Sequence, residues 1–204
     1  GKKISFEEGD IRNQDFLDQF FKTHPIDCVI HCAGLKAVAE SIQKPYAYYE
    51  NNIIGSLNLI GAMQKHNIKK LIFSSSATVY DEHEKMPLNE TSAIGQGQNP
   101  YARTKIMIEK ILQDHVISDS EWSIIVLRYF NPVGNDPSCL LGEDPKGIPN
   151  NLMPLINQAA FNTRKLTVFG TDYDTPDGSA IRDYIHVSDL AKGHVNSVEK
   201  ILRD

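Results

Sequence analysis

Two stretches of this 204-residue chain, Ser74-Ser-Ser-Ala-Thr-Val-Tyr80 and Asn99-Pro-Tyr-Ala-Arg-Thr-Lys105, indicate its fold. The serines end an apolar run that begins at Lys70, which predicts a buried strand. In the second stretch, Asn caps a helix whose first residue is Pro. Apolar residues then recur at helical spacing to about residue 117. We therefore expect a strand that ends in hydroxyl groups, a polar loop over 81–98 and a helix over 101–117.

Tyr101 and Lys105 lie four residues apart and so share one face of that helix. An ammonium about 4 Å from a phenolate favours the anion by about 4 kcal/mol at an effective dielectric constant of ~20. The pKa of the phenol then moves towards neutrality, where a tyrosine can act as a general base or acid. Taken alone, the pair is better explained as an amphipathic first turn that carries an incidental lysine.

The rest of the chain alternates strands and helices, which predicts an α/β fold with a doubly wound parallel sheet. Residues 131–151 are rich in Pro, Gly, Asn and Asp, a composition typical of a functional loop. The helix that follows Pro45 is expected to bury Ile53, Leu57, Ile60 and Met63. Strands are expected over 4–8, 27–31, 70–74, 122–129 (buried on both faces), 166–169 and 184–187, and helices over 13–24, from Pro45 to about 66, over 101–117 and near 152–162.

Composition excludes several classes of function. The formal charge is −5, and the sequence contains no Lys/Arg-rich run of the kind that binds nucleic acid. There is no signal-peptide pattern and no apolar stretch near 18 residues, so we expect a soluble cytoplasmic protein. The three cysteines suit reduced thiols. Cys28, His31 and Cys32 make a poor metal site, because neighbours on a strand point to opposite faces.

Several long stretches carry a resemblance to one family. They are His31–Val38, Phe73–Tyr80, Asn99–Tyr101, Leu127–Gly134, Gly142–Pro145, Gly147–Pro154 and Arg182–Val187. In these stretches the chain resembles the extended short-chain dehydrogenase/reductases, and within them the UDP-glucose (UDP-galactose) 4-epimerases. The resemblance implies a Rossmann-type domain over 1–130, part of a UDP-sugar-binding region over 131–182, and a return to the Rossmann-type domain over 183–204.

The resemblance also implies the reaction. Tyr101 would take the proton from the sugar 4-hydroxyl while hydride passes to NAD, and hydride would then return to the other face of the 4-keto sugar. Lys105 would lower the pKa of the tyrosine and bind the nicotinamide ribose. Ser76 would be the hydroxyl that polarises or shuttles the proton. A strand-end turn, in which the hydroxyls bond to backbone, is the alternative reading of these serines.

Further residues are implied as ligands of the cofactor and the substrate. The cofactor contacts are Asp10, Ile11, Cys32, Ala33, Gly34, Lys36, Lys105 and Tyr129. The substrate contacts are Ser76, Ala77, Thr78, Tyr129, Phe130, Asn131, Asn150, Asn151, Leu152, Thr167, Val168, Phe169 and Arg182. Arg182 suits a diphosphate because a guanidinium fork matches phosphate geometry. Asp10-Ile11 could equally cap the helix that follows.

The family's Gly-rich turn is not found in this sequence, so we expect an internal fragment of a longer enzyme. Two alternatives to an epimerase stay open. One is a truncated, inactive polypeptide of the same lineage. The other is a sugar-nucleotide dehydratase or decarboxylase, which the lack of a carboxylate in Ser75–Thr78 disfavours. The resemblance also implies a homodimer paired through the helix of Tyr101 and the long helix before it.

Overall fold

The computed structural model describes residues 4–145, 149, 151–161 and 165–203. The chain divides into two compact units, which are described separately: residues 1–128 with 194–204, and residues 129–193. The boundaries expected near residues 130 and 182 stay predictions.

The first unit contains a parallel sheet of three strands, β1 (Val29–His31), β2 (Lys70–Ser74) and β3 (Ser123–Leu127), in the order β1-β2-β3. Strand β2 lies between the other two and pairs in parallel with both. Its Leu71, Ile72 and Phe73 are fully buried, because neighbouring strands and side chains from both faces cover them. The expected α/β fold with an incomplete parallel sheet is confirmed.

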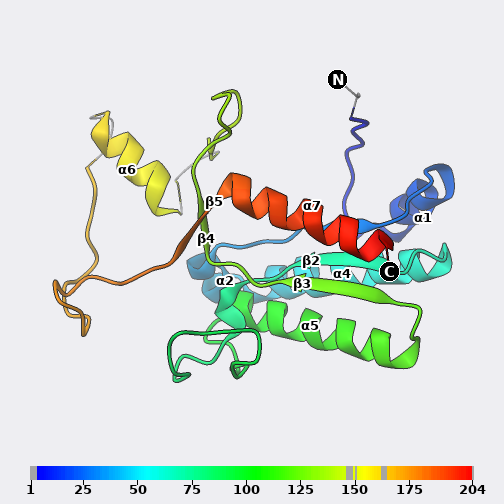
Figure 1. Cartoon of the computed structure of the whole chain (residues 1–204), viewed down its shortest axis with the longest axis horizontal. Helices are drawn as coiled ribbons and strands as arrows, with labels where there is room; N and C mark the ends of the chain where they lie inside the picture. The colour runs from blue at the N-terminus through cyan, green and yellow to red at the C-terminus, as the bar shows by residue number, and fades with distance from the viewer. Residues whose placement is uncertain (1–3, 146–148, 150, 162–164, 204) are drawn as a thin grey trace. The chain divides into compact units, whose positions relative to one another are not determined.

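Helices α1 (Gln14–Thr23), α4 (Gly55–Lys65) and α5 (Pro100–Ser118) supply one apolar core. That core joins them to Leu71 and Phe73, which alternate with Ile72 along β2 and so share one face of the sheet. The residues of helix α7 (Val187–Arg203) from His194 onward belong to this unit and include the buried Ile201. Figure 1 shows this end of α7 on the opposite side of β2 and β3 from α5.

The helix expected from Pro45 to about residue 66 forms as three consecutive segments. They are α3 (Pro45–Tyr48), the π-helix η1 (Tyr49–Ile54) and α4. Ile60 and Met63 are buried as expected, whereas Leu57 is 41% exposed. Leu57, Ile60 and Met63 all lie in α4, and Leu57 is at the margin of the face that this helix buries through Ser56, Leu59, Ile60 and Met63. A short helix, α2 (Val38–Gln43), and a 3₁₀ turn, η2 (Ala77–Val79), were not expected.

Three strand predictions need correction. Residues 4–8 are exposed and form no strand, since strand β1 at that edge pairs only with β2. No strand forms over 166–169, where Phe169 is 87% exposed. Strand β3 is half-buried rather than buried on both faces, because it is an edge strand of the sheet.

The second unit contains two short parallel strands, β4 (Asn131–Val133) and β5 (Tyr184–His186), and helix α6 (Leu152–Ala160). Strand β4 lies within the region expected to be a loop, and Pro132, which cannot donate to a ladder, is at its centre. Within the described residues, no helix is long and apolar enough to cross a membrane.

Candidate functional site

Lys105 lies at the carboxyl end of strand β2. Its Nζ atom donates a hydrogen bond to the backbone oxygen of Ser74 at 2.6 Å and lies 4.7 Å from the centre of the Phe73 ring. The side chain is buried, and this burial lowers the pKa of the ammonium to about 8, against the opposing effects of Cys32 and Glu109. Helix α5 therefore places an ammonium with a lowered pKa at the edge of the sheet where the serines begin.

The serines after β2 have separate roles. Ser76 caps the 3₁₀ turn η2, and its Oγ accepts from the backbone N of Thr78 at 3.3 Å and from Thr78 Oγ1 at 3.1 Å. The Ser75 hydroxyl points inward and donates to the carboxylate of Glu109. Ser76 thus forms the strand-end turn that was the alternative reading of these serines, and Ser76 and Thr78 place two hydroxyl groups side by side after the strand.

Tyr101 is half-buried in the first turn of α5. The Asn99 side chain accepts from the backbone N of Ala102 at 2.9 Å, which confirms the predicted cap. One turn later, Thr104 Oγ1 donates to the backbone oxygen of Tyr101 at 2.7 Å. The start of the helix is therefore fixed on both sides of the tyrosine.

Asn52, in the π-helix, was not identified from the sequence and connects two parts of the site. Its side chain donates to Thr104 Oγ1 and to the backbone oxygen of Leu35, both at 3.0 Å, and accepts from the backbone N of Leu35 at 2.8 Å. π-Helical turns occur often at functional sites. A polar residue inside an apolar helical pattern was the only sequence signal for it.

The loop after β1 is exposed at Cys32, Ala33, Gly34 and Lys36. A Cβ atom added to Gly34 would lie 3.2 Å from Asn52 Oδ1, which is tighter than ordinary contact. Cys32 Sγ lies 3.2 Å from Ser74 Oγ, which lies 3.0 Å from Nε2 of His194. This loop therefore presents backbone and small side chains beside the carboxyl end of β2.

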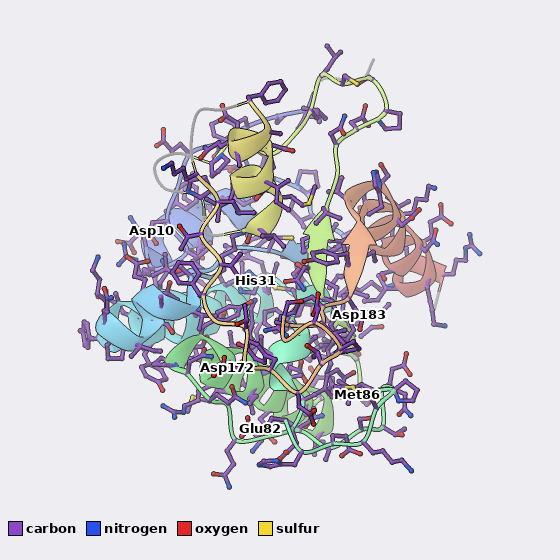
Figure 2. All side chains as sticks on the ribbon, turned by 90° about the vertical axis from the view of Figure 1, so that its left-hand side faces the viewer. Asp10, His31, Glu82, Met86, Asp172 and Asp183 are labelled. Carbon is purple, nitrogen blue, oxygen red and sulfur yellow. The ribbon has the colours of Figure 1, made fainter. Side chains whose placement is uncertain are left out.

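His31, the last residue of β1, lies inside the fold (Figure 2). Its Nε2 is 2.8 Å from Ser56 Oγ, and burial lowers the pKa of the imidazole to about 4, with the Lys105 charge adding to the effect. Within the described residues, no group of three or more His, Cys, Asp or Glu side chains could hold a metal ion. His31 is thus a neutral core histidine.

Asp10 is half-buried after the first extended segment (Figure 2). Arg12 Nη2 lies 2.6 Å from its carboxylate, and hydrogen bonds from Arg12 lower the pKa of Asp10 to about 2. The helix that follows is capped by Asn13, so the alternative role of Asp10 as its N-cap is wrong. Ile11 packs closely against Gly55 at the start of α4.

Apart from Ala77, which lies in η2 of the first unit, the remaining predicted ligands lie in the second unit. Asn131 donates to the backbone oxygen of Asp183 at 2.9 Å, and Asn151 donates to Glu143 Oε1 at 2.6 Å. The Arg182 side chain is exposed, and its Nη1 donates to the backbone oxygen of Ile181 at 3.0 Å. Tyr129 is half-buried, Phe130, Leu152, Thr167, Val168 and Phe169 are exposed, and Asn150 lies outside the described residues.

A parallel sheet whose carboxyl edge carries paired hydroxyls and a buried lysine, with a tyrosine one turn earlier on the helix of that lysine, is typical of the short-chain dehydrogenase/reductase class of proteins. Residues 1–203 match the family "Epimerase: NAD dependent epimerase/dehydratase family". This chain belongs to that family.

Within this family, the similar proteins and solved structures described next are UDP-glucose 4-epimerases. The chain is 55% identical to UDP-glucose 4-epimerase of Yersinia enterocolitica over 97% of its own length and 59% of that protein, and 54% identical to the Dictyostelium discoideum enzyme over 98% and 58%. A crystal structure of the Bifidobacterium longum UDP-glucose 4-epimerase with NAD+ and UDP superposes with a TM-score of 0.93 at 50% identity, covering 97% of this chain and 59% of that one. The chain therefore spans slightly less than three fifths of the relatives it matches, and the predicted resemblance is confirmed.

Proposed function

We propose that the protein interconverts UDP-galactose and UDP-glucose, with NAD as a bound cofactor, by reversible hydride transfer at C4 of the sugar. The observation that carries the proposal is the gathering of Ser76, Thr78 and Lys105 at the carboxyl end of β2, with Tyr101 one turn before the lysine. Relatives named UDP-glucose 4-epimerase, at 54% and 55% identity, support the choice of reaction.

The residues of the loop after β1 fit a dinucleotide. Gly34 carries no side chain that would stand between the backbone and a ligand, and the neighbouring Cys32 and Ala33 are small and exposed. Lys36 is exposed two residues later. When bound, NAD+ supplies a hydride acceptor and donor for the sugar C4. The proposed cofactor contacts are Asp10, Ile11, Cys32, Ala33, Gly34, Lys36, Lys105 and Tyr129.

In the proposed mechanism the Tyr101 phenolate removes the proton from the sugar 4-hydroxyl and returns it after the sugar has presented its other face. The Lys105 ammonium favours the phenolate through its charge. The hydroxyl of Ser76 orients the sugar 4-oxygen, with Thr78 as its neighbour. Because Lys105 is buried, its charge is little screened by water, which strengthens its electrostatic effect.

The proposed contacts to the UDP-sugar follow the family resemblance. Arg182 is the proposed partner of the diphosphate, and it is an exposed guanidinium. The full set is Ser76, Ala77, Thr78, Tyr129, Phe130, Asn131, Asn150, Asn151, Leu152, Thr167, Val168, Phe169 and Arg182.

The experiment that tests the function supplies the native protein with NAD+ and UDP-galactose and follows both UDP-glucose and the absorbance of bound NADH. We expect UDP-glucose to accumulate to equilibrium without net consumption of NAD+. Formation of a 4-keto-6-deoxy sugar would instead indicate a dehydratase. Release of carbon dioxide from UDP-glucuronate, a sugar nucleotide with a carboxylate that is supplied in a separate reaction, would indicate a decarboxylase. A folded sample that forms no product would support the inactive alternative.

We also propose that the protein is a cytoplasmic homodimer that acts in galactose metabolism. Apolar side chains are exposed along the helices expected to pair, with Ile54 48%, Leu57 41% and Met107 42% exposed. The three unpaired cysteines suit a reducing compartment. Sedimentation equilibrium tests the assembly: Met107→Lys should shift a dimer towards monomer, whereas a monomeric parent protein would refute it.

A further inference from the structure

Glu109 is a buried carboxylate outside the proposed catalytic set. It lies on α5 one turn after Lys105 and two turns after Tyr101, and it is only 5% exposed. A charged group is seldom buried without partners, because desolvation disfavours the charge. Its hydrogen-bond partners show which segments the carboxylate connects.

The first partner follows strand β2. The Ser75 hydroxyl donates to Glu109 Oε1, and Ser75 itself is 2% exposed. The backbone N of Ser75 donates to the backbone oxygen of Leu127 at 2.9 Å. Ser75 is therefore fixed from both its side chain and its backbone, immediately before Ser76.

The second partner follows strand β3. Arg128 donates to Glu109 from Nε at 3.1 Å to each carboxylate oxygen and from Nη2 at 2.7 Å to Oε2. The guanidinium carbon also lies 5.2 Å from the centre of the Tyr80 ring, and Nη1 donates to the backbone oxygen of Glu90 at 3.5 Å. The same arginine thus contacts the turn after Ser76 and the loop beyond it.

We propose that Glu109 is a positioning residue, which sets the Ser76 and Thr78 hydroxyls against Tyr101 and Lys105 by holding Ser75 and Arg128. Glu109 lies on the same helix as Tyr101 and Lys105. Its hydrogen bonds to Ser75 and Arg128 therefore fix the positions of these two residues relative to that helix. A change at Glu109 then moves the hydroxyls without touching the substrate. The inference rests on the function proposed above for its kinetic consequence, although its structural content stands on the contacts alone.

The test compares Glu109→Gln and Ser75→Ala with the wild-type native protein. Ser75→Ala removes only the hydroxyl that donates to Glu109, and it keeps the test decisive if Glu109→Gln does not fold. The matched control is Glu121→Gln, which makes the same change in an ion pair with Lys69 before β3. The readouts are kcat, KM for UDP-galactose, and amide exchange of Val79, Tyr80 and Asp81.

We expect kcat to fall about 10- to 100-fold in both variants, with KM changed less than about threefold, because misplacement of a reacting group affects the transition state more than binding. The amides of residues 79–81 should exchange about tenfold faster, while those of β2 stay protected. Glu121→Gln should match the wild type in both readouts.

Unchanged exchange at residues 79–81 in both variants would overturn the inference. Faster exchange there with unaltered kcat would overturn its catalytic part. If the wild-type protein shows no epimerase activity, the proposed function fails, and the exchange measurement alone still decides whether Glu109 holds this turn.

Discussion

The Nζ atom of Lys105 donates a hydrogen bond to the backbone oxygen of Ser74, 2.6 Å away, and so connects helix α5 to the last residue of strand β2. A lysine has three donors and no acceptor, so two N–H groups remain for other partners. Burial lowers the pKa of this ammonium to about 8. The contact therefore locates the charge, while burial weakens the hold of the ammonium on its proton.

This lowered pKa predicts how stability depends on pH. An unfolded lysine titrates near 10.4, so between pH 8 and 10 the unfolded chain binds more protons at this position than the folded chain. Relative to Lys105→Met, the wild type should gain about 2 kcal/mol of unfolding free energy from pH 8 to pH 10. Urea unfolding at several pH values measures it. Lys110→Met, which removes an exposed charge from the same helix, is the control for the loss of one positive charge. If the difference in stability between the wild type and Lys105→Met did not depend on pH, the burial argument would be contradicted.

The assignment of Tyr101 as the proton acceptor predicts a selective loss. Tyr101→Phe should lower kcat by about 10²- to 10⁴-fold, because the variant lacks the group that moves the proton. The affinity for UDP, measured by calorimetry, should change little. Tyr46→Phe is the control, since Tyr46 is 77% exposed on α3. Retention of most activity in Tyr101→Phe would remove Tyr101 from the catalytic role.

Local sequence signals predicted the elements that are fixed by local chemistry. Strand β2 has the bounds expected from its apolar run, and α5 begins at the Asn99-Pro100 cap. The alternation of strands and helices predicted the parallel sheet, because a helix between two strands lets the chain cross over and enter the second strand in the same direction. These features depend on neighbours in sequence, and so they could be read from it.

Features that depend on distant partners were missed. Leu57 is exposed because it lies outside the face that α4 buries through Ser56, Leu59, Ile60 and Met63. The roles of Asn52 and Glu109 depend on Leu35, Ser75 and Arg128, all far from them in sequence. Glu109 did give one signal, since its spacing of four residues places it on the same face of α5 as Lys105.

His31 predicts a second dependence on pH, in the acid range. The folded protein keeps this imidazole neutral down to a pKa of about 4, whereas an unfolded histidine binds its proton near 6.5. As the pH falls from 7 to 4.5, the wild type should lose about 2 kcal/mol of stability relative to His31→Gln. His83→Gln is the control because that side chain is 88% exposed. Parallel stability curves for wild type and His31→Gln would show that the buried ring accepts its proton without cost.

The exposed thiol of Cys32 gives a test of the cofactor site that does not need catalysis. Iodoacetamide reacts with thiolates, so it should modify the exposed Cys32 and Cys139 faster than Cys28, whose pKa is raised by burial. NAD+ at about ten times its dissociation constant should slow the modification of Cys32 about tenfold, because only the unoccupied protein reacts. Peptide mass spectrometry measures each cysteine separately. Cys139 should keep its rate and serves as the internal control, whereas equal rates at Cys32 with and without NAD+ would place the dinucleotide away from the loop after β1.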